Sequence, residues 1–405
     1  MKILFLTDNF PPERNAPATR TYEHCKAWAG KGAEVTVITC VPNFPEGKVF
    51  EGYRNRYAEE NMDGIRVIRV RTYIAANKGT VRRSLDYLSF YFSALRAGRK
   101  QICDIILGTS PQFFTALAAK RLSAILQKPW IMEVRDIWPE SIRTLEAVKD
   151  GPLIRFLEKK EKECYQSASG IICVTRGIFA DLVRKAVPEK KIRLFTNGAN
   201  PENFRPREKN DRLLKQLGLE GKKILGYLGT MGMSHKLDFI LHCAKNIKEP
   251  DLHFLLVGEG AEKENLLNLK ESLHLENVSI LDAVGKKEVP DYLSLMDIGL
   301  VNLRKSELFR GALPSKIFEY AAMGKPLLLG LQGEAEGIVA EYPAGLAFEP
   351  ENADDFEKKL HILLTDKEFY ARCREGCLQL ANDYDRKHIA QAMLGQIEEW
   401  SSALK

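Results

Sequence analysis

The stretch LPSKIFEYAAMGKP, residues 313–326, has the pattern of a helix that leads directly into a strand. Pro314 and Ser315 are residue types that begin helices, whereas Gly324 followed by Pro326 is typical of a helix end. The apolar run 327–330 comes next and predicts a buried strand. A helix followed at once by a buried strand is the repeating unit of a parallel sheet covered by helices.

The same alternation extends outward from this stretch over the whole chain. Short apolar runs predict two series of strands, at 3–7, 35–39, 65–70, 104–107, 130–134, 170–174 and 192–195, and at 223–228, 252–257, 278–281, 298–303 and 326–330. Stretches with helical spacing, such as 22–30 and 113–126, lie between them. We therefore predict an α/β fold with two doubly wound parallel sheets.

A turn-rich segment separates the two series and predicts a linker. It consists of TNGANP at 196–201 and the charged RPREK at 205–209. The expected domains are 1–198 and 199–386, with a ligand-binding cleft between the carboxyl ends of their sheets. The helical stretch 387–400 follows the second domain, and we place it across the domain junction.

Composition excludes several classes of protein. With 405 residues, 45% hydrophobic and 28% charged, the chain is neither disordered nor collagen-like. Its net charge of +6 is too small to indicate nucleic acid. The charge is unevenly divided, because residues 1–195 carry 33 basic and 21 acidic side chains and residues 196–405 carry 27 and 33. The basic half predicts an anionic partner for the first domain.

The cysteines and the apolar runs indicate a cytosolic location. Eight cysteines without a Cys-x-x-Cys pair predict reduced, mostly buried thiols rather than disulfides or a zinc site. The start of the chain reads as a strand and lacks the features of a signal peptide. No apolar stretch reaches the ~18 residues of a spanning helix, so we expect any membrane contact to be peripheral.

Residues 313–326 also carry the clearest sign of a ligand. The helix start would present the free amides of Ser315, Lys316 and Ile317, and the Lys316 ammonium adds a full charge, as a phosphate site requires. Glu319 lies one turn further along and could accept the hydroxyls of a ribose. The alternative is a capped amphipathic helix with an exposed Lys and Glu. The combination before a strand favours a nucleoside diphosphate.

Two further turns in the second half favour the same ligand. Gly229 and Thr230 follow a predicted strand, and Lys236 is near enough in sequence to supply a second cation for a diphosphate. Gly258 lies in another turn of this kind. Each signal is weak alone, since glycine after a strand is usually only turn chemistry.

Loops of the first half supply charged residues to the other side of the predicted cleft. The first turn lacks Gly-x-Gly-x-x-Gly, which argues against a dinucleotide enzyme, but the loop after it carries Arg14 and Arg20. A second loop, residues 132–141, is dense in charged and aromatic side chains, which include Arg135, Asp136, Trp138 and Glu140. Surface ion pairs are the alternative for this second loop.

The segment 81–96 predicts an amphipathic helix. Its apolar stripe is Leu85, Leu88, Phe92 and Leu95, and basic residues lie at both ends. Such a helix can be half-buried core, or it can lie on anionic lipid.

Taken together, these motifs resemble the retaining glycosyltransferases of family 4, which have the GT-B fold of two Rossmann-like domains. The branch that the chain resembles contains bacterial L-fucosamine transferases of O-antigen and capsule synthesis. The resemblance covers nearly the whole chain. Its specific parts are the Trp-Pro-Glu-Ser stretch at 138–141 and the Pro-Ser-Lys stretch at 314–316.

The resemblance implies a role for several of these residues. Glu319 would hold the ribose, Lys236 and Lys316 would neutralise the diphosphate, and the Gly229 turn would contact the leaving phosphate. The final helix, within 387–405, would return to the first domain. Asp136 would orient the acceptor hydroxyl or the sugar. No metal, cofactor or protein nucleophile is expected, because the leaving phosphate can take the acceptor proton.

The sequence departs from the family pattern at three places. Gly311 stands where a second Glu usually contacts the donor sugar, Arg135 stands where many members have His, and NAPA at 15–18 replaces a common glycine pair. The first departure leaves the identity of the donor sugar open.

The predicted function is transfer of a hexose or N-acetylamino-hexose from a nucleotide sugar, expected to be UDP-linked, to a lipid-linked saccharide in bacterial surface polysaccharide synthesis. We expect the protein in the cytoplasm, on the anionic inner face of the plasma membrane. A sugar-nucleotide 2-epimerase of the same fold and a non-catalytic nucleotide-sugar-binding partner are the alternatives. The oligomeric state stays open.

Overall fold

The computed structural model describes residues 1–13, 15–44, 47–74, 80–138 and 151–402. The chain divides into two compact units. Unit 1 comprises Met1–Thr196 and the segment that begins at Arg386, and unit 2 is Asn197–Asp385.

Unit 1 is built on an eight-stranded sheet with the order β3-β4-β2-β1-β5-β6-β7-β8. All neighbours are parallel except β3 and β4, which pair antiparallel at one edge. The strands are β1 Lys2–Leu6, β2 Glu34–Cys40, β3 Ala58–Met62, β4 Ile65–Val70, β5 Ile105–Thr109, β6 Trp130–Val134, β7 Gly170–Cys173 and β8 Ile192–Leu194.

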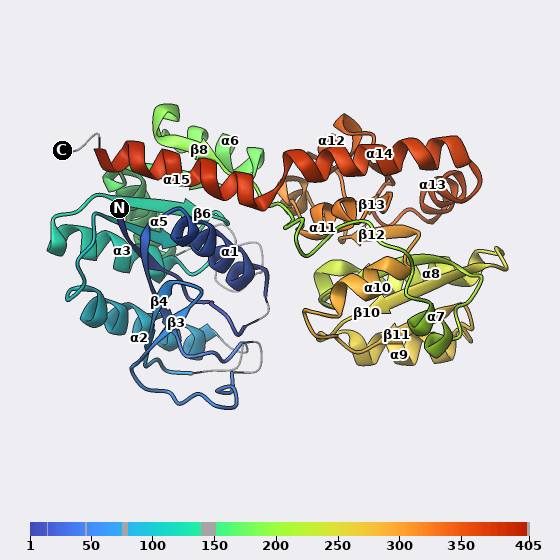
Figure 1. Cartoon of the computed structure of the whole chain (residues 1–405), viewed down its shortest axis with the longest axis horizontal. Coiled ribbons are helices and arrows are strands. Elements are labelled where there is room, and N and C mark those ends of the chain that lie inside the picture. Colours follow the sequence, from blue (N-terminus) through green and yellow to red (C-terminus); the bar gives the residue numbers. More distant parts are fainter. Residues whose placement is uncertain (14, 45–46, 75–79, 139–150, 403–405) are drawn as a thin grey trace. The chain divides into compact units, whose positions relative to one another are not determined.

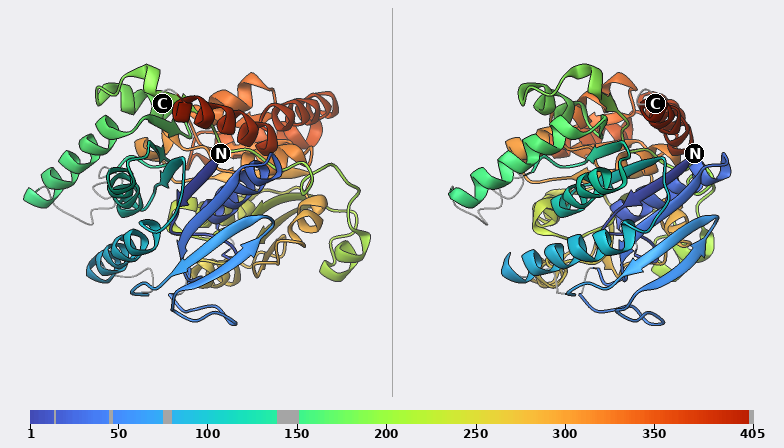
Figure 2. Two further views of the ribbon diagram at one scale, coloured as in Figure 1. Left: turned by 60° about the vertical axis from the view of Figure 1, so that its left-hand side comes forward. Right: turned by 90° about the vertical axis from the view of Figure 1, so that its left-hand side faces the viewer.

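Helices cover both faces of this sheet, as Figures 1 and 2 show. One face packs against α2 Thr80–Gly98, α3 Phe113–Leu126, α5 Pro152–Ser167 and α6 Arg176–Arg184. The other face packs against α1 Ala16–Gly30 and α15 Arg386–Ser402. The Trp28 indole in α1 donates to the Ala390 carbonyl in α15 at 2.7 Å, so the end of the chain is anchored in unit 1.

Unit 2 is built on a six-stranded parallel sheet with the order β11-β10-β9-β12-β13-β14. The strands are β9 Lys223–Leu228, β10 Leu252–Val257, β11 Val278–Leu281, β12 Ile298–Asn302, β13 Leu327–Gly330 and β14 Gly345–Ala347. One face packs against α7 Asp211–Leu217, α10 Val289–Leu295, α11 Lys316–Ala322, α12 Glu334–Glu341 and α14 Lys367–Asp383. The other packs against α8 Leu237–Asn246, α9 Lys263–Ser272 and α13 Ala353–Thr365. Short 3-10 helices are η1 Glu189–Lys191, η2 Met233–His235 and η3 Glu307–Gly311.

The predicted fold class is confirmed, since both units are doubly wound parallel sheets. Every predicted strand forms, and the final helix forms as α15. Two observed strands, β3 and β14, are not among the predicted ones. In β3 the sequence AEENM is polar and lies at an exposed edge, and β14 has only three residues.

The structure also bears out the expected thiols, because all eight cysteines are buried and free. Among the described helices, none combines the length and the apolar character needed to cross a bilayer.

Candidate active site

The first group of predicted site residues meets in unit 2, where the start of α11 approaches the turn after β9. The Lys316 ammonium lies 4.7 Å from the centre of the Tyr227 ring and donates to the Tyr227 hydroxyl at 3.4 Å. Gly229 has a φ of +148°, and a Cβ there would lie 2.3 Å from the Lys316 Cε. The turn therefore requires glycine so that its backbone can lie against the lysine.

The turn after β10 packs on the same place. A Cβ on Gly258 would lie 1.8 Å from the Gly229 carbonyl oxygen. The Gly229 amide donates to the Val257 carbonyl at 2.9 Å, and the Met231 amide donates to the Glu259 carbonyl at 2.8 Å. The structure thus brings together Gly229, Gly258 and Lys316, which the sequence analysis assigned to one ligand from three separate segments.

The Lys316 side chain is a desolvated cation. Burial lowers its pKa to about 8, and the opposing influence of Glu319, one turn along α11, is smaller. Burial and the Lys316 charge together lower the pKa of His235 to about 4, so the imidazole is neutral at pH 7. A desolvated ammonium against a glycine turn suits an anionic group such as a diphosphate.

Lys236, the predicted second cation, is held by a neighbour. It adopts a left-handed backbone conformation, with φ of 47°, and its ammonium pairs with Asp238 at 2.6 Å. The Asp238 carboxylate raises the pKa of Lys236 through this hydrogen bond. Both side chains are substantially exposed, so the pair is weak enough for a ligand to compete with it.

The start of α11 differs from the expectation in one respect. We expected the amides of Ser315, Lys316 and Ile317 all to be free, but the Ile317 amide donates to the Pro314 carbonyl at 3.2 Å. Ser315 already has helical backbone angles and its side chain makes no capping bond. The prediction of three free amides is therefore wrong, and the lysine is the stronger anion-binding element.

Several residues that support the site were missed by the sequence analysis. The Tyr227 hydroxyl donates to the Thr230 carbonyl at 2.5 Å, and the Tyr320 hydroxyl accepts from the Leu228 amide at 2.8 Å. Asn302 donates to the carbonyls of His235, at 2.9 Å, and Lys236, at 3.3 Å. Thr230 itself is exposed. An aromatic or an amide at the end of a strand gives no distinctive signal in a single sequence.

The second group of predicted residues lies in unit 1. Arg20, expected to face an acceptor, is 3% exposed and pairs with the buried Glu133 at 3.2 Å. The same Nη2 also donates to the Phe195 carbonyl at 2.9 Å, and Nη1 donates to the Thr196 carbonyl at 2.7 Å. These contacts fix the end of β8 and the chain that follows it, so Arg20 is a structural residue here and not one exposed to a ligand.

The two residues that follow β6 are held by a serine hydroxyl. The amides of Arg135 and Asp136 donate to the Ser110 hydroxyl, at 2.7 and 3.3 Å. Two buried nitrogens of the Arg135 guanidinium, Nε and Nη1, have no hydrogen-bond partner within the described residues. The Asp136 side chain is exposed.

Trp138 stacks on Phe113, with ring centres 5.2 Å apart and an interplanar angle of 14°. Its ring therefore packs against the unit 1 core. Arg14 and Glu140 lie outside the described residues. Within the described ranges, no three His, Cys, Asp or Glu side chains gather as they would around a metal ion.

Comparison with known proteins identifies both halves of the chain. The sequence model of the glycosyl transferase 4-like domain matches residues 15–198, and that of glycosyl transferases group 1 matches residues 209–377. A putative colanic acid biosynthesis glycosyl transferase of Escherichia coli (strain K12), WcaI, is 26% identical over 367 residues, which are 87% of this chain and 90% of the relative.

Solved structures share the fold over nearly the full length. Sucrose-phosphate synthase from Thermosynechococcus elongatus superposes with a TM-score of 0.78, at 16% identity and over 100% of both chains. Anabaena Alr3699/HepE in complex with UDP-glucose superposes with a TM-score of 0.72, at 14% identity, over 98% of this chain and 100% of the other.

Proposed function

Because this chain belongs to the glycosyltransferases of family 4, we propose that it is a retaining enzyme of bacterial surface polysaccharide synthesis. The donor is a hexose or N-acetylamino-hexose linked to UDP, and the acceptor is a lipid-linked saccharide. The relative in colanic acid biosynthesis supports the pathway class, and the structural neighbour that holds UDP-glucose supports the donor class. The L-fucosamine branch is part of the same proposal.

The observation that carries this proposal is the position of Lys316 against the Gly229 turn. Glycosyl transfer leaves a nucleoside diphosphate whose negative charge grows as the sugar bond breaks. A preorganised, partly desolvated ammonium stabilises that charge more than water does. Because Gly229 has no side chain, Lys316 can lie directly against the backbone of the turn, where its ammonium would meet the leaving phosphate.

The other predicted roles complete the donor site. Glu319 lies on α11 one turn from Lys316 and would accept the ribose hydroxyls. Lys236 would exchange its weak pairing with Asp238 for the diphosphate. Two lysines would then supply the positive charge, and we expect the enzyme to need neither a metal nor another cofactor.

Transfer with retention would need no nucleophile from the protein. The leaving phosphate oxygen would take the proton of the acceptor hydroxyl as that hydroxyl attacks the anomeric carbon. Asp136, exposed after β6, would orient the acceptor hydroxyl or the sugar. The basic first half of the chain would face an anionic membrane on its cytoplasmic side, so binding to phosphatidylglycerol vesicles should weaken as salt rises.

A thermal-shift screen with UDP, GDP, ADP and their sugars tests the donor assignment. UDP should raise the melting temperature of the wild type by mass action, and Lys316→Met should remove that rise. Lys325→Met is a matched control, because burial lowers the pKa of Lys325 to about 8 as well, and its ammonium donates to the Ser294 carbonyl at 3.0 Å. An equal rise in all three proteins would refute the assignment.

A further inference from the structure

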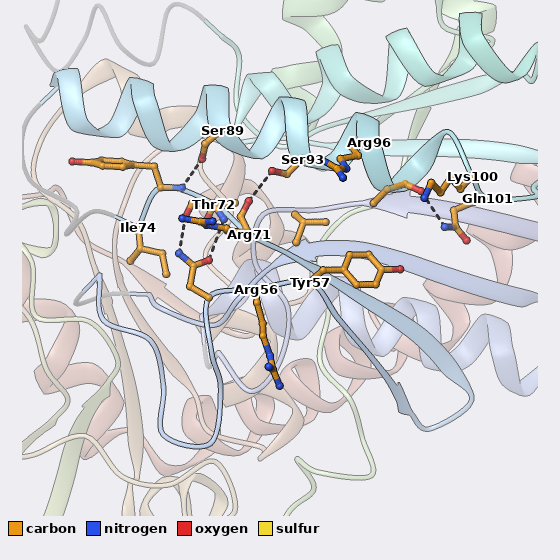
Figure 3. A pocket seen from close by; sticks show the side chains of 14 residues that line it. Arg56, Tyr57, Arg71, Thr72, Ile74, Ser89, Ser93, Arg96, Lys100 and Gln101 are labelled. Carbon is orange, nitrogen blue, oxygen red and sulfur yellow. Dashed lines mark hydrogen bonds between the residues drawn. The ribbon is translucent and has the colours of Figure 1, made fainter.

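A pocket of about 960 Å³ lies in unit 1, away from the residues discussed so far. It lies between α2 and the segments on either side of the β3–β4 pair. Figure 3 shows Ser89, Ser93, Arg96 and Lys100 reaching it from α2 and the turn after it, with Arg56 and Tyr57 on the opposite side.

Hydrogen bonds between side chains and backbone hold the walls of this pocket. The Asn55 side chain donates to the Thr72 carbonyl at 2.7 Å and accepts from the Thr72 amide at 3.1 Å. From α2, the Ser89 hydroxyl accepts from the Tyr73 amide at 2.7 Å, and the Ser93 hydroxyl donates to the Arg71 carbonyl at 2.7 Å. Two loops and a helix are therefore fixed around one space.

The pocket is uniformly cationic. Its charged lining residues are Arg56, Arg71, Arg96 and Lys100, and no Asp or Glu lines it. Within the part of the chain that the structure describes, none of the four makes an ion pair. These four exposed cations give the space a positive potential that attracts a ligand with several negative charges.

The helix that supplies Arg96 also exposes an apolar stripe. Leu85, Leu88 and Phe92 are 48%, 39% and 65% exposed. Since successive residues of a helix are about 100° apart, this stripe lies roughly a quarter-turn from the stripe that lines the pocket. An apolar surface of this kind beside a cationic pocket matches a molecule with an anionic head and a hydrocarbon chain.

We propose that this pocket binds the diphosphate of a lipid-linked substrate, with the hydrocarbon chain along Leu85, Leu88 and Phe92. The inference rests on the proposed function only in naming the acceptor as the source of the diphosphate. The two phosphates bind the arginines and Lys100. The donor diphosphate has its own site in unit 2.

Binding of farnesyl diphosphate to the full chain, measured by titration calorimetry, tests the pocket. The double variant Arg71→Gln/Arg96→Gln should weaken binding at least about tenfold, because the diphosphate loses its charge-assisted hydrogen bonds to two arginines. The double variant Arg82→Gln/Arg99→Gln is the matched control. It removes the same charge from two exposed residues near the ends of α2, neither of which lines the pocket. It should leave the affinity for farnesyl diphosphate unchanged. Equal weakening by both double variants, or no binding to the wild type, would overturn the inference.

Two further comparisons test whether the ligand carries a hydrocarbon chain. Phe92→Ser should weaken the binding of farnesyl diphosphate and leave that of inorganic pyrophosphate unchanged. Equal affinity of the wild type for both compounds would overturn the assignment to a lipid. Displacement of farnesyl diphosphate by phosphatidylglycerol vesicles, with an equal loss of vesicle binding in both double variants, would instead indicate a general membrane-binding surface. That result would also overturn the assignment to a lipid-linked diphosphate.

UDP titrated into the same preparations separates this inference from the proposed function. A chain that binds UDP but not farnesyl diphosphate refutes the pocket and leaves the donor assignment intact. A chain that binds farnesyl diphosphate but neither UDP nor another nucleotide refutes the proposed function and supports the pocket.

Discussion

Replacing Lys316 by Met should stabilise the protein while it damages the donor site. Burial lowers the pKa of Lys316 from 10.5 to about 8. At about 1.4 kcal/mol per pKa unit, the buried charge costs ~3 kcal/mol of folding free energy. The contact with the Tyr227 ring, at 4.7 Å, returns about 1 kcal/mol of that to the wild type. A methionine of similar shape avoids the charge, so we expect a net gain of about 2 kcal/mol at pH 7.

The pH dependence gives this prediction a sign that can be checked. Between pH 8 and 10.5 the unfolded wild type holds the Lys316 proton and the folded protein has released it, so wild-type stability rises with pH over that range. The advantage of Lys316→Met should therefore shrink between pH 7 and pH 10. Urea unfolding at both pH values measures it.

Measuring the UDP affinity of the same proteins tests the role of Lys316 in donor binding. Lys316→Met should weaken UDP binding at least about tenfold, because a charge-assisted hydrogen bond is lost, and Lys325→Met should not. A variant less stable than the wild type at pH 7, or one that binds UDP as tightly, would show that Lys316 is an ordinary structural lysine.

Four other substitutions test the packing of the fold and the site. Gly258→Ala should cost about 3 kcal/mol or more in urea unfolding, because its Cβ would meet a carbonyl oxygen of the turn after β9 at 1.8 Å. Gly337→Ala, in an open part of α12, should instead stabilise the protein by about 0.5–1 kcal/mol. Equal changes in stability for Gly258→Ala and Gly337→Ala would contradict the close packing at Gly258. Arg20→Met should cost about 3–5 kcal/mol by leaving Glu133 buried and unpaired, and a small loss would mean that the pair is dispensable. Burial keeps the pKa of His24 well below 6.5, so stability should fall as the pH drops below 6.5 and the unfolded chain takes up a proton. His24→Gln should lessen that fall by up to about 1.4 kcal/mol per pH unit, and an unchanged slope would contradict the burial of a neutral ring.

The sequence predicts most of the sheet framework because buried parallel strands are nearly continuous apolar runs. The bounds of β6, β9, β10 and β11 agree with the predicted ranges to the residue. Apolar runs do not reveal a strand that is not buried on both faces. β3 is an exposed, polar, antiparallel edge, and β14 is too short to form a pattern.

The candidate site shows the same division between what a sequence contains and what packing decides. Glycines after strands and a lysine at a helix start are visible as residue types, so Gly229, Gly258 and Lys316 could be assigned from the sequence alone. The burial of Arg20 and the supporting contacts of Tyr227 depend on long-range packing. The sequence shows the charge of Arg20 but not its buried ion pair with Glu133.

Product analysis tests the central claim, glycosyl transfer with retention, most directly. The purified full chain would be incubated with UDP-sugars, with and without a farnesyl-diphosphate-linked sugar as acceptor, and the products followed by NMR spectroscopy. We expect UDP release that depends on the acceptor, together with a new glycosidic bond of the same anomeric configuration as the donor. Epimerised nucleotide sugar without acceptor, inverted product, or tight donor binding with no turnover would contradict it.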